Sequence, residues 1–168
     1  MPYDNQEELF FHVDENDQVI GSITRGEAHA DPNLIHRAVD ILLSNDQDEI
    51  LMQKRSENKD VRPGHWTVSA SGHVTYPETY EEAAEKELQE ELGLNLPLQK
   101  ISTYLIHLNN ETEFVTLFIG NYNQTPTNFD QIEVAELKWV PLAKLAAFCE
   151  NNPITPATDH IFHLLGYL

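Results

Sequence analysis

Three glutamates, Glu87, Glu90 and Glu91, follow one another at three- and four-residue spacing. In a helix, at about 100° per residue, this spacing places their carboxylates on one face. Like charges placed so repel one another by roughly 0.2–0.5 kcal/mol per exposed pair, and by more when they are partly buried. A divalent cation can neutralise them, and hard carboxylate oxygens suit Mg²⁺ or Mn²⁺. The pattern therefore indicates a metal-dependent site, with a solvated acidic helix face as the alternative.

The segment that would position these glutamates is predicted to be a helix over residues 79–92. Thr79 can cap its N-terminus, Glu82 can reach back to complete the cap, and Gly93 supplies a stop. Glu91 falls inside the apolar sector of the helical wheel, whereas Glu87 and Glu90 lie at its edge. The apolar stripe consists of Tyr80, Ala84, Leu88 and Leu92. This helix would therefore hold part of the acidic cluster against the protein core.

The remaining segments predict a sheet with helices packed on it. Residues 38–43 and 50–54 resemble a hairpin that turns at 45–48, and the last two helices are expected at 141–150 and 157–167. Other strands are predicted at 9–13, 19–23, 66–74, 100–108, 113–120 and 137–140. The mixed order favours an α/β (α+β) layered fold with a mixed sheet, formed by one domain over residues 1–168.

The composition narrows the class of protein. The 168 residues carry a formal net charge of −18, which repels nucleic acid polymers but allows a small phosphorylated substrate bridged by cations. No apolar run is long enough to span a membrane, and Met1 to Asp4 do not resemble a signal peptide. The single Cys149 excludes an internal disulfide. These features predict a cytoplasmic protein; they carry no signal for an oligomeric state.

Basic residues are unevenly distributed in this acidic chain. Four of the ten fall within nine residues: Lys54, Arg55, Lys59 and Arg62. The cluster can be an ordinary solvated loop, or it can be an anion-binding patch. Arg55 and Lys59, together with Arg25, are the candidates for binding a diphosphate.

The acidic helix belongs to a longer pattern that resembles the Nudix box. Gly72 is followed after five residues by Glu78 and after seven more by Lys86-Glu87-Leu88-Gln89-Glu90-Glu91-Leu92-Gly93-Leu94. Eight of the nine defining positions match; the exception is Lys86, where the family has arginine. The resemblance implies a Nudix-type α/β/α sandwich and a metal-dependent enzyme that cleaves a phosphoanhydride bond.

Residues that flank the box resemble the isopentenyl-diphosphate-isomerase-like branch of this superfamily. The chain contains His36-Arg37-Ala38-Val39, Gln53-Lys54-Arg55-Ser56 and Pro63-Gly64-His65-Trp66-Thr67 in the order found there. In that branch three histidines and two glutamates bind a metal. The resemblance implies a possible second divalent site at His29, His36, His73, Glu111 and Glu113, with inherited but unused polar residues as the alternative. Such mixed ligands suit Mn²⁺, Zn²⁺ or Fe²⁺.

Two departures from the isomerases favour hydrolysis. The isomerases use a cysteine in proton transfer, and alignment through Trp66 and His73 places Ser71 at that position. A thiol titrates near about 8.5, which an unassisted hydroxyl cannot match. The isomerases also typically lack the full set of hydrolytic glutamates, which this chain retains. The alternatives are an isomerase-like enzyme acting on prenyl diphosphates and a non-catalytic Nudix domain that senses a ligand.

The Nudix resemblance also implies roles for individual residues. Mg²⁺ or Mn²⁺ would bridge the glutamates to the diphosphate of a nucleoside-diphosphate-linked or related substrate. Glu87 and Glu91 are the preferred direct ligands, and Glu90 is either a ligand or the base that activates water. Lys86 would orient a box glutamate. Gly72 would let the backbone approach the metal, with its carbonyl as a possible ligand.

Overall fold

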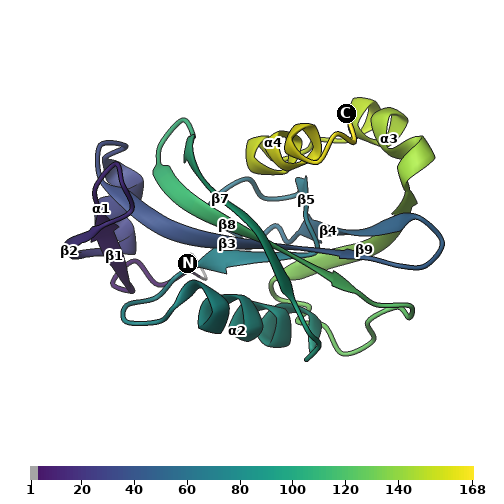
Figure 1. The fold of residues 1–168 in the computed structure, drawn as a ribbon, viewed down its shortest axis with the longest axis horizontal. Coiled ribbons are helices and arrows are strands. Elements are labelled where there is room, and N and C mark those ends of the chain that lie inside the picture. The colour runs from purple at the N-terminus through teal and green to yellow at the C-terminus, as the bar shows by residue number, and fades with distance from the viewer. Residues whose placement is uncertain (1–3) are drawn as a thin grey trace.

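The computed structural model describes residues 4–168 as a curved mixed sheet with helices on both faces (Figure 1). Helix α2 lies below the sheet in this view, and α3 and α4 lie above it. The elements are β1 (Leu9–Val13), β2 (Val19–Thr24), α1 (Arg25–Ala30), β3 (Ile35–Ser44), β4 (Glu49–Arg55), β5 (Trp66–Thr67), β6 (Ala70–His73), α2 (Tyr80–Leu92), β7 (Gln99–His107), β8 (Thr112–Asn121), β9 (Val134–Pro141), the 3₁₀ turn η1 (Leu142–Lys144), α3 (Leu145–Asn151) and α4 (Pro156–Leu164). The predicted α/β class is confirmed.

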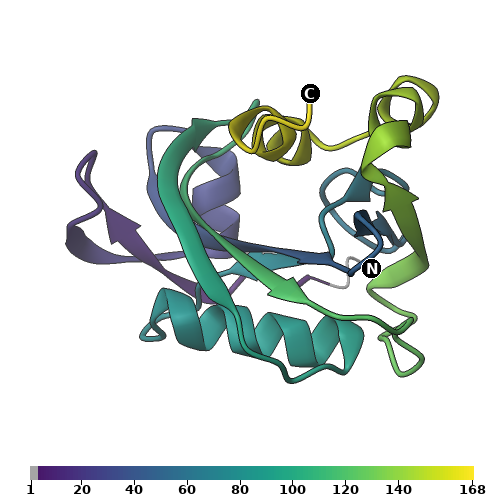
Figure 2. The same ribbon diagram turned by 45° about the vertical axis from the view of Figure 1, so that its right-hand side comes forward.

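Strand β3 organises the sheet because it has a partner along each edge. It pairs in parallel with β8 along its whole length and antiparallel with β6 through residues 38–41. Its alternate side chains face opposite layers. Val39, Ile41 and Leu43 pack against α2, whereas Leu42 packs on the side of α3 and α4. The two helical layers therefore pack against opposite faces of the same strand (Figure 2).

The predicted hairpin of residues 38–43 and 50–54 is only partly correct. β3 and β4 meet at the pair Ser44 and Ile50 and then diverge, because each strand finds other partners. β4 pairs with β9, which begins at Val134 and is therefore longer than the predicted strand at 137–140. The short helix α1 was not predicted, although Thr24 and Glu27 form a complete capping box at its start. Because β4 diverges from β3, the edge of β3 at residues 38–41 pairs with β6 instead.

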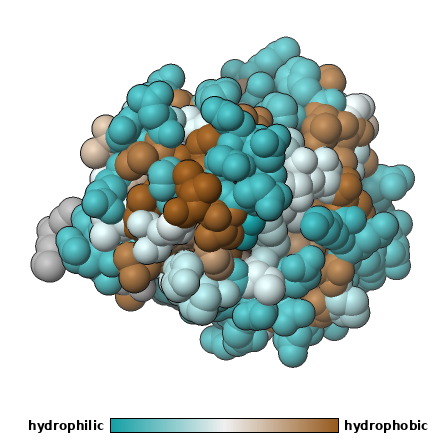
Figure 3. Space-filling model, turned by 60° about the vertical axis from the view of Figure 1, so that its left-hand side comes forward, coloured by the Kyte–Doolittle hydropathy of each residue, from teal (hydrophilic) through white to brown (hydrophobic). Residues whose placement is uncertain are grey.

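Apolar side chains are exposed around the hairpin of β1 and β2. Leu9, Val19, Ile20 and Tyr76 are each between 45% and 59% exposed. A view from this side shows apolar surface among hydrophilic residues (Figure 3). None of these side chains lines the cavity described below. Across residues 4–168, no helix combines the length and the apolar character needed to cross a membrane.

Candidate active site

Helix α2 presents its glutamates to the edge of the sheet at β6. The Thr79 hydroxyl accepts the backbone N–H of Glu82 at the helix start, and Gly93 ends the helix in the left-handed conformation. The return bond from the Glu82 side chain is not formed among the described residues, so the expected cap is half present. Glu91 is only 5% exposed, which confirms its place in the apolar sector. Its Oε2 accepts the backbone N–H of Ser71 at 2.9 Å.

Glu87 closely approaches the backbone of Gly72. A Cβ atom on residue 72 would overlap the carboxyl group of Glu87, so any other residue would force that carboxyl group to move. Gly72 therefore lets the α2 carboxylates sit against the β6 backbone. This observation supports the expectation that the backbone closely approaches a metal bound by these acids.

Burial and repulsion by neighbouring acids raise the pKa of two α2 glutamates, Glu87 and Glu91. Burial raises the pKa of Glu91 to about 8, although the Ser71 N–H opposes the shift. Burial and the charge of Glu91 likewise raise the pKa of Glu87 well above its usual value. The charge of Glu133, the residue just before β9, raises the pKa of both Glu87 and Glu91 further. A cation bound here would replace these protons.

This competition predicts a Mg²⁺ requirement that depends on pH. Glu91 is largely protonated below about pH 8, so Mg²⁺ must displace a proton there, whereas above its pKa the carboxylate is already free. The Mg²⁺ concentration for half-maximal activity should rise about tenfold for each pH unit below that pKa if one proton is released. Initial rates measured across a series of Mg²⁺ concentrations and pH values would show this. A Mg²⁺ requirement independent of pH would contradict it.

Lys86 pairs with the first acid of the box. Its Nζ lies 2.6 Å from Glu78 Oε1 and 3.3 Å from Thr75 Oγ1. Glu90, four residues further along the helix, could also pair with Lys86, but Glu78 is the acid that Lys86 contacts. Lys86 thus ties α2 to the segment between β6 and the helix.

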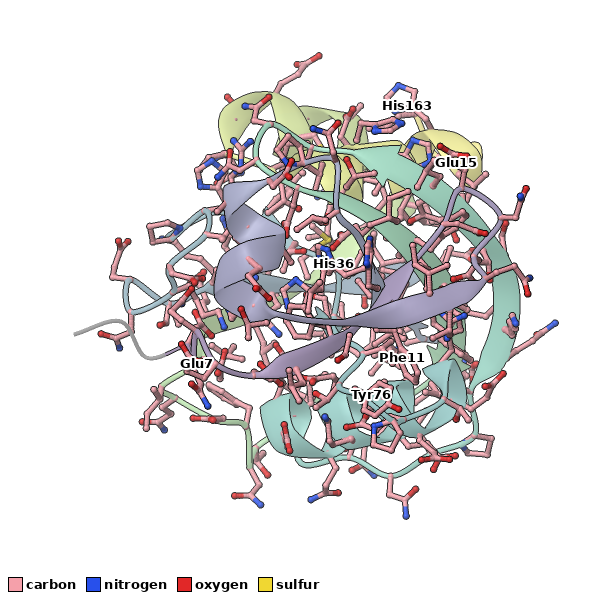
Figure 4. The ribbon with its side chains drawn as sticks, turned by 90° about the vertical axis from the view of Figure 1, so that its left-hand side faces the viewer. Glu7, Phe11, Glu15, His36, Tyr76 and His163 are labelled. Carbon is pink, nitrogen blue, oxygen red and sulfur yellow. The ribbon has the colours of Figure 1, made fainter. Side chains whose placement is uncertain are left out.

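A cavity of about 580 Å³ joins the sites that the sequence singled out (Figure 4 shows the side chains from the side of β1 and β2). Glu87, Glu90 and Glu91 line it from α2. The backbone segment Ser71–Gly72–His73 of β6 lines it from the sheet, together with further predicted residues: Arg25, Arg55, Lys59, Glu111 and Glu113. The two predicted metal sites therefore open into one space.

The histidine and glutamate cluster forms one end of this cavity. His29 Nε2 lies 2.7 Å from Glu111 Oε2, and His36 Nε2 lies 3.4 Å from the same oxygen and 3.2 Å from Glu113 Oε2. His73 Nε2 approaches His29 Nε2 at 3.4 Å. His36, which is labelled in Figure 4, is fully buried. Donor atoms from β3, β6, β8 and α1 thus converge, although they are far apart in the sequence.

These residues fit a divalent metal. Ligand atoms of His29, His36, His73 and Glu111 all lie within 4.8 Å of one another. Both ring nitrogens of His36 and one oxygen of each glutamate are buried and form no hydrogen bond of good geometry among the described residues, although His36 Nε2 lies within ion-pair distance of both oxygens. Burial lowers the pKa of His73 to about 3, which keeps its ring neutral as a ligand requires. Arg25 faces His73 Nδ1 at 3.0 Å, so ligation through Nε2 needs a proton on Nδ1 and a shift of Arg25.

The candidate diphosphate-binding residues differ in whether they already form ion pairs with acidic side chains. Arg25 lies 3.1 Å from Asp60 Oδ1 and also faces Asp4 and Glu8. Lys59 Nζ lies 2.9 Å from Asp4 and 2.7 Å from Glu133. Arg55 donates to the carbonyl of Val61, and no ion pair holds it within residues 4–168. A diphosphate could therefore bind Arg55 without displacing an acid.

Sequence reasoning missed four acids of the cavity: Asp4, Glu8, Asp40 and Glu133. Burial raises the pKa of Asp40 to about 8, and the charge of Glu113 adds to the shift. Asp4 and Glu133 come from opposite ends of the chain and meet at Lys59. No local motif marks them, although the isolated Asp40 within an apolar strand was a visible signal.

Comparison with known proteins gives the family. The sequence matches the NUDIX domain over residues 34–165. It is 37% identical over 153 residues to isopentenyl-diphosphate Delta-isomerase 2 of Photorhabdus laumondii subsp. laumondii, covering 88% of this chain and 85% of that protein. It is 31% identical over 154 residues to prenyl-diphosphate phosphatase of Methanosarcina mazei, covering 89% of each. The crystal structure of DR0079 from Deinococcus radiodurans shares the fold with a TM-score of 0.79 at 23% identity, covering 93% and 98% of the two chains.

A mixed sheet between helices, with a carboxylate-bearing helix at a cavity, is thus the architecture of a Nudix-type enzyme. The chain belongs to the Nudix family. The relatives include both an isomerase and a phosphatase, so family membership leaves the reaction to be argued from the site.

Proposed function

We propose that this protein is a metal-dependent hydrolase that cleaves the phosphoanhydride bond of a small diphosphate substrate. The observation that carries the proposal is the meeting of Glu87, Glu90 and Glu91 with Ser71 in one cavity. The glutamates supply the carboxylates needed for hydrolysis. Ser71 supplies a hydroxyl where the isomerases have a thiol, so the isomerase alternative lacks a proton-transferring group. The name of the Methanosarcina mazei relative agrees with hydrolysis of a diphosphate.

Different residues of the chain would bind the cation, activate the water and orient the diphosphate. Glu87 and Glu91 would hold the cation, with Gly72 providing the space beside them. A bound Mg²⁺ or Mn²⁺ would neutralise charge on the anhydride oxygens and lower the pKa of an attacking water. Glu90 is exposed on the same face and can accept a proton from water. Arg55, aided by Lys59 and Arg25, would orient the diphosphate.

The cluster of His29, His36, His73, Glu111 and Glu113 would hold a second divalent metal in this proposal. The convergence of its buried ring nitrogens and carboxylate oxygens supports that role, since one metal can satisfy them together. Residues of the cluster would then position the substrate end that lies away from the α2 carboxylates.

Hydrolysis should depend fully on Mg²⁺ or Mn²⁺. A panel of nucleotide sugars, dinucleotides, nucleoside di- and triphosphates and prenyl diphosphates would be screened for release of phosphate or of the product nucleotide. Chelator should abolish the activity of the best substrate and added metal should restore it, because the α2 carboxylates cannot stabilise the anion alone. Elemental analysis before chelation would count the metals per chain.

Full turnover in excess chelator would exclude this mechanism. Tight binding of one diphosphate without turnover of any compound would instead favour the ligand-sensing alternative, in which the glutamates are retained without catalysis.

A further inference from the structure

Asp40 is a carboxyl group that neither metal site uses. It lies in the middle of β3, is 7% exposed and lines the cavity. No side chain within residues 4–168 hydrogen-bonds to it; its electrostatic neighbours are Glu113, which repels it, and Arg55, which attracts it from beyond ion-pair distance. Its carboxyl group therefore faces the cavity with no protein partner, which leaves it free to hydrogen-bond to a group of a bound ligand.

Strand pairing fixes where Asp40 points. It is directly opposite Ser71 in the antiparallel pair of β3 and β6, and Ala38 is opposite His73 one step along. Residues opposite one another in a sheet face the same side. Asp40 therefore lies beside Ser71, whose backbone N–H binds Glu91, and next to the end of the cavity that holds His73. Its side chain faces the layer of α3 and α4, but one cavity contains both Asp40 and the α2 carboxylates, so an organic group attached to a diphosphate at those carboxylates would extend toward it.

The rest of the cavity wall is suited to a small polar group. Thr67, Ser71 and Thr155 line it together with short aliphatic side chains, of which Leu108 is the largest. Apart from the imidazole of His73, no aromatic ring lines the cavity among residues 4–168. The wall thus offers neither a stacking surface for a nucleobase nor an aromatic pocket for a long hydrocarbon.

We propose that Asp40 determines substrate specificity by accepting a hydrogen bond from a hydroxyl on the organic group of the diphosphate substrate. The inference rests on the proposed hydrolase function and narrows it to diphosphates of hydroxyl-bearing alcohols. A carboxyl oxygen accepts such a bond in either protonation state. A pure hydrocarbon would cover Asp40 and leave it unpaired, which is how a polar site rejects an analogue that lacks the hydroxyl.

Two compounds that differ by one hydroxyl test this inference. Dimethylallyl diphosphate would be compared with its analogue in which one methyl group is hydroxymethyl. Wild-type kcat/KM should be about 10- to 100-fold higher for the hydroxylated compound, a conservative range for a missing hydrogen bond. Asp40→Leu should abolish this preference, because it should lower kcat/KM for the hydroxylated compound and raise kcat/KM for the hydrocarbon. Asp40→Asn, which keeps a carbonyl acceptor, should retain most of it.

Binding measured by calorimetry with Ca²⁺ separates this inference from the proposed function. Preferential binding of the hydroxylated compound in Ca²⁺, with no hydrolysis of either compound in Mg²⁺ or Mn²⁺, would support the role of Asp40 and contradict the proposed hydrolase function. Equal affinities and equal kcat/KM in the wild type would overturn the role of Asp40 alone, whether or not Asp40→Leu folds. Loss of bound metal in Asp40→Asn would also overturn it, since Asp40 would then be a metal ligand.

Discussion

Replacing Glu91 by glutamine should lower kcat by at least about 100-fold, because loss of groups that merely support metal ligands already costs about 10- to 100-fold. The substitution removes the charge and little volume. The glutamine carbonyl can still accept the Ser71 N–H that now binds Glu91 Oε2. The fold should therefore persist while cation binding fails. Steady-state kinetics at saturating Mg²⁺ would measure the loss.

The thermal midpoint should not fall in this variant. Burial opposes ionisation of Glu91 and raises its pKa to about 8, so an uncharged amide relieves a cost to the metal-free fold. Glu85→Gln is the matched control, since Glu85 is an exposed acid on the same helix. It should keep wild-type kcat. If Glu91→Gln also kept it, the catalytic centre would lie elsewhere.

Local signals were sufficient to predict α2 and its glutamates. The cap at Thr79, the stop at Gly93 and the wheel position of Glu91 all depend on neighbours within a few residues. The same kind of signal was present for α1, where Thr24 and Glu27 form a capping box. Six residues are too few to show helical periodicity, and α1 was therefore overlooked.

Long-range pairing could not be predicted in the same way. The residues of β3 and β4 have the pattern of a hairpin, but β8 and β6 compete successfully for β3. The partners of a strand depend on the packing of the whole sheet, not on its own sequence. The same limit applies to the cavity. The acids that pair with Arg25 and Lys59 come from residues 4, 8, 60 and 133, and only the fold brings them together.

The wild-type protein should not interconvert isopentenyl and dimethylallyl diphosphate. That reaction adds a proton at one carbon and removes another elsewhere, so it needs two groups that change protonation in the site. Glu113 lies in the cavity and can serve as one. Ser71 stands where the other would be, and its hydroxyl holds its proton far more tightly than a thiol with a pKa near about 8.5. Product analysis after long incubation with isopentenyl diphosphate, Mg²⁺ and either Mn²⁺ or Zn²⁺ would test this expectation.

Ser71→Cys is the variant expected to gain isomerase activity, from none to a measurable rate. The thiol would occupy the cavity position of the hydroxyl, and the backbone N–H that binds Glu91 would remain. Ser71→Ala is the control, because it changes the side chain without adding a titrating group. The gain should disappear when Glu113→Gln is added, since the second proton-transferring group is then lost. A gain confined to Ser71→Cys would show that the cluster of His29, His36, His73, Glu111 and Glu113 is assembled. Robust isomer formation by the wild type would overturn the choice of hydrolase over isomerase.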